Sequence, residues 1–257
     1  MSTYLIELFI FIFGLCIGSF LNVCIYRLPI SKSIVKPRSM CFNCGSSIAA
    51  YDNIPILSYL WLLGRCRHCR TRISLRYPMV EFLSGLIALG TYLKFGLNME
   101  ALIYYLFFTA LVVVTFIDAD HRIIPDIITL PGIPICFLAS FALPTITYLD
   151  SLLGILAGGG SLFLVAWTYS MITKKEGMGG GDIKLLAMMG AVIGWKGVLF
   201  TIFVASLAGT LAGFAVILQS RRGLKLAVPF GPFLSIGCMM YIFFGSPLIS
   251  WYFNLLG

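Results

Sequence analysis

The sequence predicts an all-α polytopic membrane protein, with about eight transmembrane helices and a small zinc-ribbon-like loop domain after the first helix. Hydrophobic residues make up 60% of the 257 residues and charged residues only 11%, whereas a soluble domain of this length has a far more charged surface. Apolar runs of about 17–25 residues recur along the chain, which is the length a bilayer-spanning helix needs. Basic residues gather in alternate connecting segments, as expected for a chain that crosses a membrane repeatedly.

The first apolar run, 4–26, lacks both a basic n-region and a small-residue cleavage site. We therefore expect a retained first span rather than a cleaved signal peptide. A tight turn at 194–197 separates the sixth and seventh spans. The spans after the first are expected near residues 79–95, 101–118, 127–144, 151–172, 183–198, 198–219 and 229–254. This gives three domains: the first helix (1–26), a cysteine-rich loop domain (27–77) and a seven-helix membrane domain (78–257).

Lysine and arginine orient these spans. The segment 27–77 contains nine of the 18 basic residues, and the loops 119–126, 173–184 and 220–226 contain one, three and three more. By the positive-inside rule these segments are cytoplasmic and both termini lie outside. The formal net charge of +8 then reports orientation and contact with the anionic lipid bilayer, not nucleic-acid binding.

Two aspartates lie where an apolar run meets a polar loop on the cytoplasmic side. Asp118 ends the third span and Asp182 begins the sixth. A charged residue in a membrane helix costs roughly 2.5–3.5 kcal/mol at the helix centre and less toward the interface, so such residues are usually functional. Two adjacent carboxylates cannot easily both ionise, and the proton they share allows one to activate water. The pattern predicts peptide hydrolysis by this pair.

Each aspartate also has a structural interpretation. Asp182 can cap a helix, and Asp118 can be a helix-terminal residue solvated by headgroups. Asp120 and Asp126 compete with Asp118 as the partner. Asp126 follows a proline and is expected to cap the fourth span, whereas Asp120 is expected on another, more exposed helix face. His121 can tune the pair or simply be solvated.

Glycines precede Asp182, and Gly177, Gly179, Gly180 and Gly181 would let an extended substrate strand approach the main chain. The alternative is a flexible loop without contact to substrate. The segment 229–233 contains Gly231 and Pro232 and opens the last span. It is expected either to line the substrate cavity as irregular backbone or to be a proline-initiated helix start.

Four cysteines form the second cluster of candidate site residues. Cys41, Cys44, Cys66 and Cys69 make two C-x2-C pairs with 21 residues between them. This spacing suits a tetrahedral zinc site, and a reducing cytoplasm disfavours disulfides. A structural zinc is favoured over a catalytic or redox metal, and His68 is an alternative ligand. The other cysteines (Cys16, Cys24, Cys136 and Cys238) are expected to be packing residues.

Ordered motifs along nearly the whole chain resemble the type IV prepilin peptidase family, a group of GxGD-type intramembrane aspartyl proteases. These motifs are 18–29, the two Cys-x-x-Cys pairs, 53–59, 64–66, 76–81, 117–126, 177–184 and 230–233. The family implies a bifunctional enzyme of the bacterial inner membrane. It cleaves the leader of prepilins and pseudopilins after a glycine on the cytoplasmic side, then N-methylates the new N-terminal residue, usually Phe, with S-adenosylmethionine.

Carried to this chain, the resemblance implies that Asp118 and Asp182 are the proteolytic pair and that the cysteine loop belongs to the methyl-transfer part. Asn22 and Glu81 lie near that loop and Gly64 lies within it, and these three residues are candidates for methyl transfer. For Asn22 and Glu81, helix–helix hydrogen bonding or capping is an equal alternative. Two other functions stay open: an intramembrane aspartyl protease without methyltransferase activity, and a zinc-ribbon transporter or scaffold.

Overall fold

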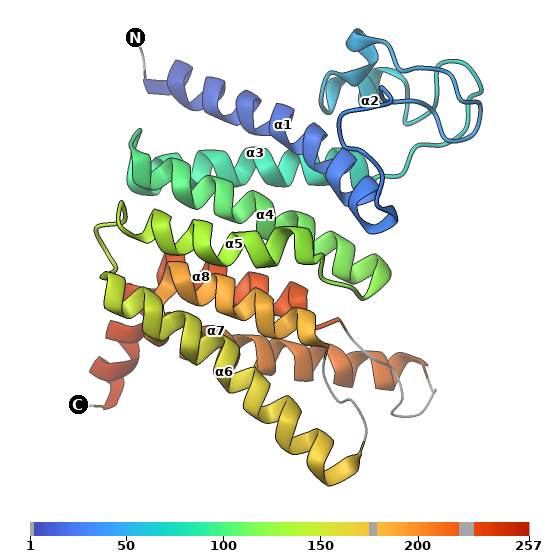
Figure 1. The fold of residues 1–257 in the computed structure, drawn as a ribbon. Helices are drawn as coiled ribbons and strands as arrows, with labels where there is room; N and C mark the ends of the chain where they lie inside the picture. Colours follow the sequence, from blue (N-terminus) through green and yellow to red (C-terminus); the bar gives the residue numbers. More distant parts are fainter. Residues whose placement is uncertain (1–2, 175–178, 221–228, 257) are drawn as a thin grey trace. The chain divides into compact units, whose positions relative to one another are not determined.

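The structure is a computed structural model that describes residues 3–174, 179–220 and 229–256. Over these ranges the chain forms α-helices, two short 3-10 helices and two isolated β-bridges, without any strand. The predicted all-α class is therefore confirmed. The elements run in the order α1 (Thr3–Arg27), η1 (Leu28–Ile30), η2 (Ala50–Asn53), α2 (Leu57–Trp61), α3 (Arg76–Phe95), α4 (Met99–His121), α5 (Asp126–Ser140), α6 (Tyr148–Thr173), α7 (Gly180–Ser220) and α8 (Gly231–Leu256) (Figure 1).

Four of the described helical segments are long and apolar enough to cross a membrane. They are Thr3–Ile30, Met99–His121, Tyr148–Thr173 and Gly180–Ala215, and Asp126–Ser140 and Gly231–Gly245 are shorter apolar helices. The predicted sixth and seventh spans form one element, α7, which is interrupted at Gly194. That residue has a φ of 66° and a ψ of 177°. Glycine adopts this backbone easily because it has no Cβ. The break therefore lies within the turn predicted from the sequence at 194–197.

The described chain divides into two compact units, Met1–Val113 and Val114–Gly257. Unit 1 holds α1, the loop domain, α3 and the first part of α4. Unit 2 holds the rest of α4 and the helices α5 to α8. The packing thus groups α3 with α1, whereas the sequence suggested a boundary after residue 77.

In unit 1, α1 and α3 lie against each other through small residues. A Cβ built on Gly14 would come 2.8 Å from the Cα of Gly85, and one on Gly18 would come 2.6 Å from the Cα of Glu81. Glycine allows this because the two backbones meet where a side chain would otherwise stand. The Ser84 hydroxyl lies 3.1 Å from the Tyr105 hydroxyl and so joins α3 to α4.

In unit 2, α6 and the first half of α7 pack backbone against backbone. A Cβ on Gly154 would lie 2.1 Å from the Gly190 carbonyl oxygen, and one on Gly158 would lie 2.4 Å from the Leu186 carbonyl oxygen. The Ser151 hydroxyl donates to the Ala191 carbonyl oxygen over 2.7 Å. This contact fixes the part of α7 that begins close to Asp182.

Gly190→Ala is expected to destabilise the protein, because its methyl group would collide with backbone that cannot move aside alone. Overpacking of this kind costs about 1–3 kcal/mol. Gly160→Ala is the matched control, since a Cβ there meets nothing within 4 Å. The measurement is thermal unfolding in detergent, followed by circular dichroism. Equal midpoints for the two variants would show that the α6–α7 contact is looser than described.

Candidate active site and metal centre

Asp118 lies near the end of α4, within unit 2, and its residue is 5% exposed. Its Oδ2 accepts a hydrogen bond from the backbone N–H of Gly231, the first residue of α8, over 2.9 Å in a buried setting. A Cβ on Gly231 would lie 2.7 Å from this oxygen, so the contact needs glycine. Asp118 is therefore held by protein rather than merely solvated by headgroups.

Asp182 lies in the first turn of α7, after Gly180 and Gly181, and so does not precede the helix as a cap would. Its Oδ1 is buried without a hydrogen-bond partner among the residues that the structure describes. Asp118 acts on it electrostatically. A buried polar atom without a partner calls for an explanation such as a bound water or a shared proton. Asp118 and Asp182 therefore lie near enough within unit 2 for the charge of one to act on the other, and their role as a catalytic pair stays a prediction.

The competing aspartates occupy different positions. Asp120 is exposed, as its place two residues after Asp118 predicts. Asp126 is the first residue of α5 and makes no cap: Pro125 holds the N-cap position, without a side-chain hydrogen bond. The expectation that Asp126 caps this helix was wrong, because its carboxylate is engaged by a lysine of another helix.

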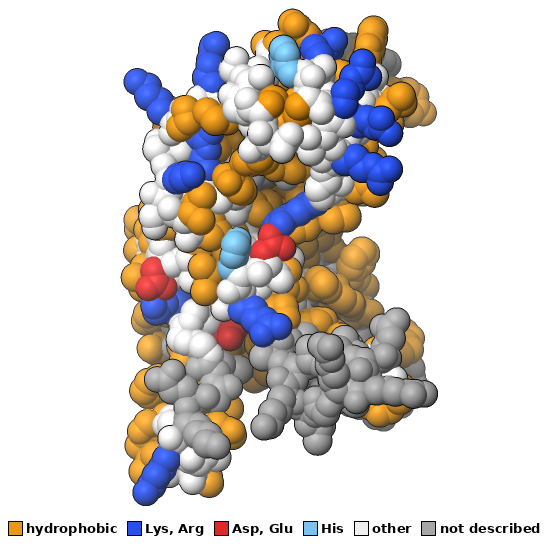
Figure 2. Space-filling view, turned by 90° about the vertical axis from the view of Figure 1, so that its right-hand side faces the viewer, with side chains coloured by type: hydrophobic (Ala, Val, Ile, Leu, Met, Phe, Trp, Pro, Cys, Tyr) orange, Lys and Arg blue, Asp and Glu red, His pale blue; other side chains and the backbone are white. Residues whose placement is uncertain are grey.

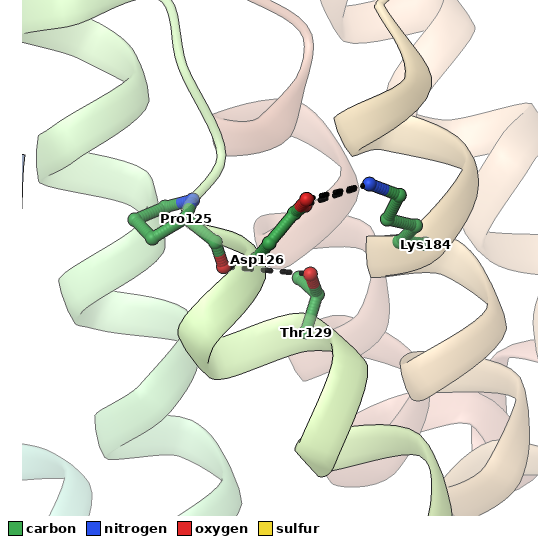
Figure 3. A network of polar contacts seen from close by, with 4 residues as sticks. All are labelled: Pro125, Asp126, Thr129 and Lys184. Carbon is green, nitrogen blue, oxygen red and sulfur yellow. Dashed lines mark hydrogen bonds and ion pairs between the residues drawn. The ribbon is translucent and has the colours of Figure 1, made fainter.

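That lysine is Lys184, two residues after Asp182 in α7. Its ammonium lies 2.8 Å from each carboxylate oxygen of Asp126. Figure 3 shows this ion pair between the starts of α5 and α7, with the Thr129 hydroxyl donating to the Pro125 carbonyl oxygen over 3.4 Å. The pair therefore joins the turn that bears Asp182 to α5.

Lys184→Met is expected to lower stability only slightly. The two side chains are 35% and 55% exposed, and solvent-exposed pairs contribute about 0.2–1 kcal/mol. The exchanged pair Asp126→Lys with Lys184→Asp should recover most of the loss, whereas either reversal alone should not. Unfolding midpoints of the single and double variants measure the coupling, and Lys174→Met, at an exposed position after α6, is the control. If the stability losses of the two single variants simply add in the double variant, Asp126 and Lys184 do not interact.

The glycines before Asp182 have different surroundings. Gly177 lies outside the described residues. Among the residues that the structure describes, a Cβ on Gly180 would meet nothing within 4 Å, whereas one on Gly181 would lie 2.8 Å from the Cβ of Ile124. Gly181 is therefore required by packing inside unit 2, whereas a Cβ on Gly179 would make only an ordinary contact, 3.9 Å from Oδ2 of Asp182.

The segment before α8 is a regular helix start, not irregular backbone. The Phe230 carbonyl oxygen accepts from the N–H groups of Phe233 and Leu234, each over 3.1 Å. Pro232 is the second helical residue, where its missing N–H costs nothing. Of the two expectations for this segment, the proline-initiated helix is correct. What the sequence did not anticipate is the Gly231 N–H directed at Asp118.

The four predicted metal ligands converge in the loop domain of unit 1. The Sγ atoms of Cys41, Cys44, Cys66 and Cys69 all lie within 4.8 Å of one another, and those of Cys41 and Cys69 are 3.7 Å apart. Tetrahedral zinc with bonds of about 2.3 Å separates its sulfur ligands by roughly 3.8 Å. All four thiols are free. The set fits a structural metal ion.

Each cysteine pair is built as a tight knuckle. The N–H of Cys41 donates to the Ser46 carbonyl oxygen and that of Cys66 to the Thr71 carbonyl oxygen, each over 2.9 Å. The residue after each second cysteine has a positive φ: 68° at Gly45 and 60° at Arg70. Equivalent turns therefore present both pairs to one centre.

Hydroxyl groups tune two of these thiols. The pKa of Cys69 is lowered to about 5, first by the Thr71 hydroxyl 3.3 Å from its Sγ, and then by the Thr71 backbone and the Asn43 side chain. The Ser46 hydroxyl, 3.4 Å from the Cys44 Sγ, likewise lowers the pKa of that thiol. Metals bind the thiolate, so both effects favour ligation. The sequence analysis missed Ser46 and Thr71, although both stand two residues after the second cysteine of a pair.

The methyl-transfer candidates are engaged in contacts within unit 1. The Asn22 side-chain amide donates to the carbonyl oxygens of Gly18 and Tyr77, over 3.3 and 3.0 Å. The Glu81 carboxylate accepts from the Ile56 N–H over 2.8 Å. Gly64 has a φ of 65°, and a Cβ there would lie 2.7 Å from the Tyr59 hydroxyl. Each of the three residues therefore has a role in the packing of unit 1 that does not require a bound methyl donor.

Two family models match the chain: the bacterial peptidase A24 N-terminal domain over residues 12–95 and the type IV leader peptidase family over residues 105–214. The chain is 36% identical to a prepilin leader peptidase/N-methyltransferase from Aeromonas hydrophila, over 95% of this chain and 92% of that protein. It is 35% identical to the protein of the same name from Pseudomonas putida, over 96% and 93%, and 39% identical to the one from Myxococcus xanthus, over 85% and 65%. No solved structure gives a significant match.

The two matches follow one another along the chain, and the first contains the cysteine pairs while the second contains Asp118 and Asp182. Relatives of similar length match it almost from end to end. The chain therefore belongs to the type IV prepilin peptidase family, a family of membrane proteases, and the three relatives above are also named for N-methyl transfer.

Proposed function

We propose that this protein removes the leader of prepilins and pseudopilins after a glycine and then N-methylates the new N-terminal residue with S-adenosylmethionine. The names of the relatives support both activities. The observation that supports the proteolytic part is a set of two carboxylates in unit 2: Asp118 is buried and accepts the Gly231 N–H, and Asp182, which has a buried Oδ1, lies within reach of its charge. Both residues come from helix ends in unit 2, where the starts of α5, α7 and α8 also lie (Figure 1).

The hydrolytic step needs one acid and one base. The base carboxylate takes a proton from a water molecule, whose oxygen then attacks the scissile carbonyl carbon. The acid gives its proton to the departing amine, so the peptide C–N bond breaks and the pair again holds one proton. The different settings of the two carboxylates support such a division of roles. Asp118 accepts a backbone hydrogen bond, whereas Asp182 has a buried oxygen for which the described part of the chain offers no hydrogen-bond partner.

The proposed topology places this site at the cytoplasmic face of the bacterial inner membrane, with both termini outside. The basic residues of the connecting segments support this orientation. A prepilin presents a basic leader in the cytoplasm and an apolar helix in the bilayer, so its scissile bond lies at that face. Gly179 and Gly180 would receive the extended substrate, and Gly231 with Pro232 would form the opposite wall.

Gly180→Val is expected to slow leader cleavage severely, because the branched side chain would occupy the space proposed for the substrate. Gly181→Val is the poorer test, since it also strikes Ile124. Gly213→Val is the matched control, because a Cβ at that helical glycine also meets none of the described residues within 4 Å. Cleavage rates are compared at equal protein abundance and metal content. Normal cleavage by Gly180→Val would remove this glycine from the substrate path.

The methyl-transfer part is supported by the names of the relatives alone, because Asn22, Gly64 and Glu81 are engaged in fold contacts. When bound, S-adenosylmethionine supplies an electrophilic methyl group to the new amine. Zinc is the metal that we propose for the four cysteines, since a tetrahedral thiolate set is typical of structural zinc.

Mass spectrometry of a candidate pilin tests the whole proposal. The pilin is isolated from cells with and without this enzyme, and its N-terminal peptide is sequenced. We expect the leader to be present without the enzyme, and to be replaced in its presence by a new N-terminus that carries one methyl group. A cleaved but unmethylated N-terminus would show that the protein is a protease without methyltransferase activity. A pilin that keeps its leader in the presence of the enzyme would refute both activities.

A further inference from the structure

We propose that an apolar surface on and around α2 anchors the loop domain in the membrane interface, against anionic phospholipid. We call this the α2 surface, and it consists of Ile54, Leu57, Leu60, Trp61 and Leu63. The inference concerns unit 1 alone and goes beyond the proposed chemistry. The loop domain is then half-immersed in the interface rather than suspended in the cytoplasm.

The residues of the α2 surface are apolar and largely exposed, although they lie outside the predicted membrane spans. Trp61 is 85% exposed, Leu63 84%, Leu57 64% and Leu60 62%. Leu57, Leu60 and Trp61 stand three and four residues apart in α2, so they lie on one face of this helix. An exposed apolar patch on a protein surface marks a site that is covered by a partner or by a membrane.

A hydrogen bond fixes the position of α2 along the axis of the spanning helix α1. The Ile56 N–H, directly before α2, donates to the Glu81 carboxylate over 2.8 Å. The Cα of Glu81 lies against Gly18, which precedes the last residue of α1, Arg27, by nine residues. At a rise of about 1.5 Å per residue, Gly18 is roughly 13 Å inside the end of α1. The start of α2 is thereby tied to a helix position within the membrane span.

A second part of the loop domain also folds back along α1. The Arg27 guanidinium donates to the carbonyl oxygens of Ser33 and Pro37, over 2.9 and 2.8 Å. A cavity of about 330 Å³ separates this loop from α1, and its lining runs along α1 from Cys16 to Arg27 and includes Ile34 and Asn53. The loop therefore flanks about the last half of the spanning helix rather than standing beyond it.

Charge supports a lipid surface as the occupant. The segment 27–77 contains nine basic residues and one acidic residue, Asp52, and that carboxylate is already paired with Arg67 at 2.6 Å. Figure 2 shows Lys and Arg side chains gathered over the upper part of the view, where the loop domain lies. Basic residues next to apolar and tryptophan side chains are typical of segments that lie in the interface of anionic membranes.

Tryptophan fluorescence tests the proposal on the full-length protein. The chain has four tryptophans, so a variant with Trp167, Trp195 and Trp251 changed to Phe reports Trp61 alone. A matched variant that keeps only Trp167, which is 51% exposed on the spanning helix α6, is the reference for lipid contact. Both are reconstituted into vesicles of phosphatidylcholine and phosphatidylglycerol. The quenchers are lipids brominated near the headgroup end of their acyl chains and, in the water phase, acrylamide.

We expect brominated lipid to quench Trp61 about as strongly as it quenches Trp167, and acrylamide to quench it weakly. Brominated phosphatidylglycerol should quench Trp61 more than an equal fraction of brominated phosphatidylcholine, because the basic residues enrich anionic lipid. Strong quenching by acrylamide alone would overturn the proposal and leave the surface in water. Protection from both quenchers would overturn it in favour of a protein contact. Equal quenching by the two brominated lipids would show that the basic residues do not enrich anionic lipid at the α2 surface, and would overturn that part of the proposal.

Discussion

Asp118→Asn and Asp182→Asn are each expected to abolish leader cleavage while the protein stays folded in the membrane. Asparagine keeps the shape of the side chain, and its amide oxygen can still accept the Gly231 N–H at position 118. It cannot take up or release the shared proton, and positioned acid–base groups contribute about 10²–10⁴-fold in rate. The measurement is the rate at which purified variants remove the leader from a prepilin in detergent or vesicles.

Asp120→Asn is the matched control, because this exposed aspartate stands two residues from Asp118 on the same helix. It should retain substantial activity. If Asp120→Asn is inactive and Asp118→Asn is active, the pair has been misassigned. Unchanged unfolding midpoints for all three variants would show that the losses arise from chemistry and not from misfolding.

Replacing Cys41, Cys44, Cys66 and Cys69 together by serine is expected to remove the metal and unfold the loop domain. The wild-type protein should carry about one zinc per chain, held as in a ribbon with four thiolates. Structural zinc contributes on the order of 10–16 kcal/mol at pH 7, which a short loop cannot replace by packing. Metal analysis and limited proteolysis of residues 27–77 are the measurements.

Cys16→Ser is the control for this variant, because Cys16 lies in α1 and outside the cluster, and it should keep the zinc. We expect the fourfold variant to lose methylation more completely than cleavage, since the proposed proteolytic aspartates stand on helices of unit 2. Wild-type protein that is free of metal yet has an ordered, active loop would refute the structural role.

The short-range features of this protein could be predicted because they repeat at fixed spacings. Apolar runs predicted the helices, and the Gly194 turn predicted the break in α7. The two C-x2-C pairs predicted a four-thiolate cluster, since two residues between cysteines suit a tight turn that directs both sulfurs to one side. The placement of Asp118 and Asp182 at span ends also followed from the sequence alone.

The contacts that complete the candidate sites join residues far apart in the chain, and only the tertiary structure decided them. Gly231 reaches Asp118 across 113 residues, and Lys184 reaches Asp126 across 58. Such contacts depend on how each helix is rotated and how far it slides along its neighbour. Hydropathy cannot specify either quantity, because most faces of a membrane helix are apolar. The sequence by itself determined the helices, the cluster of four cysteines and the family, and the packing decided which backbone and charged groups surround the two aspartates.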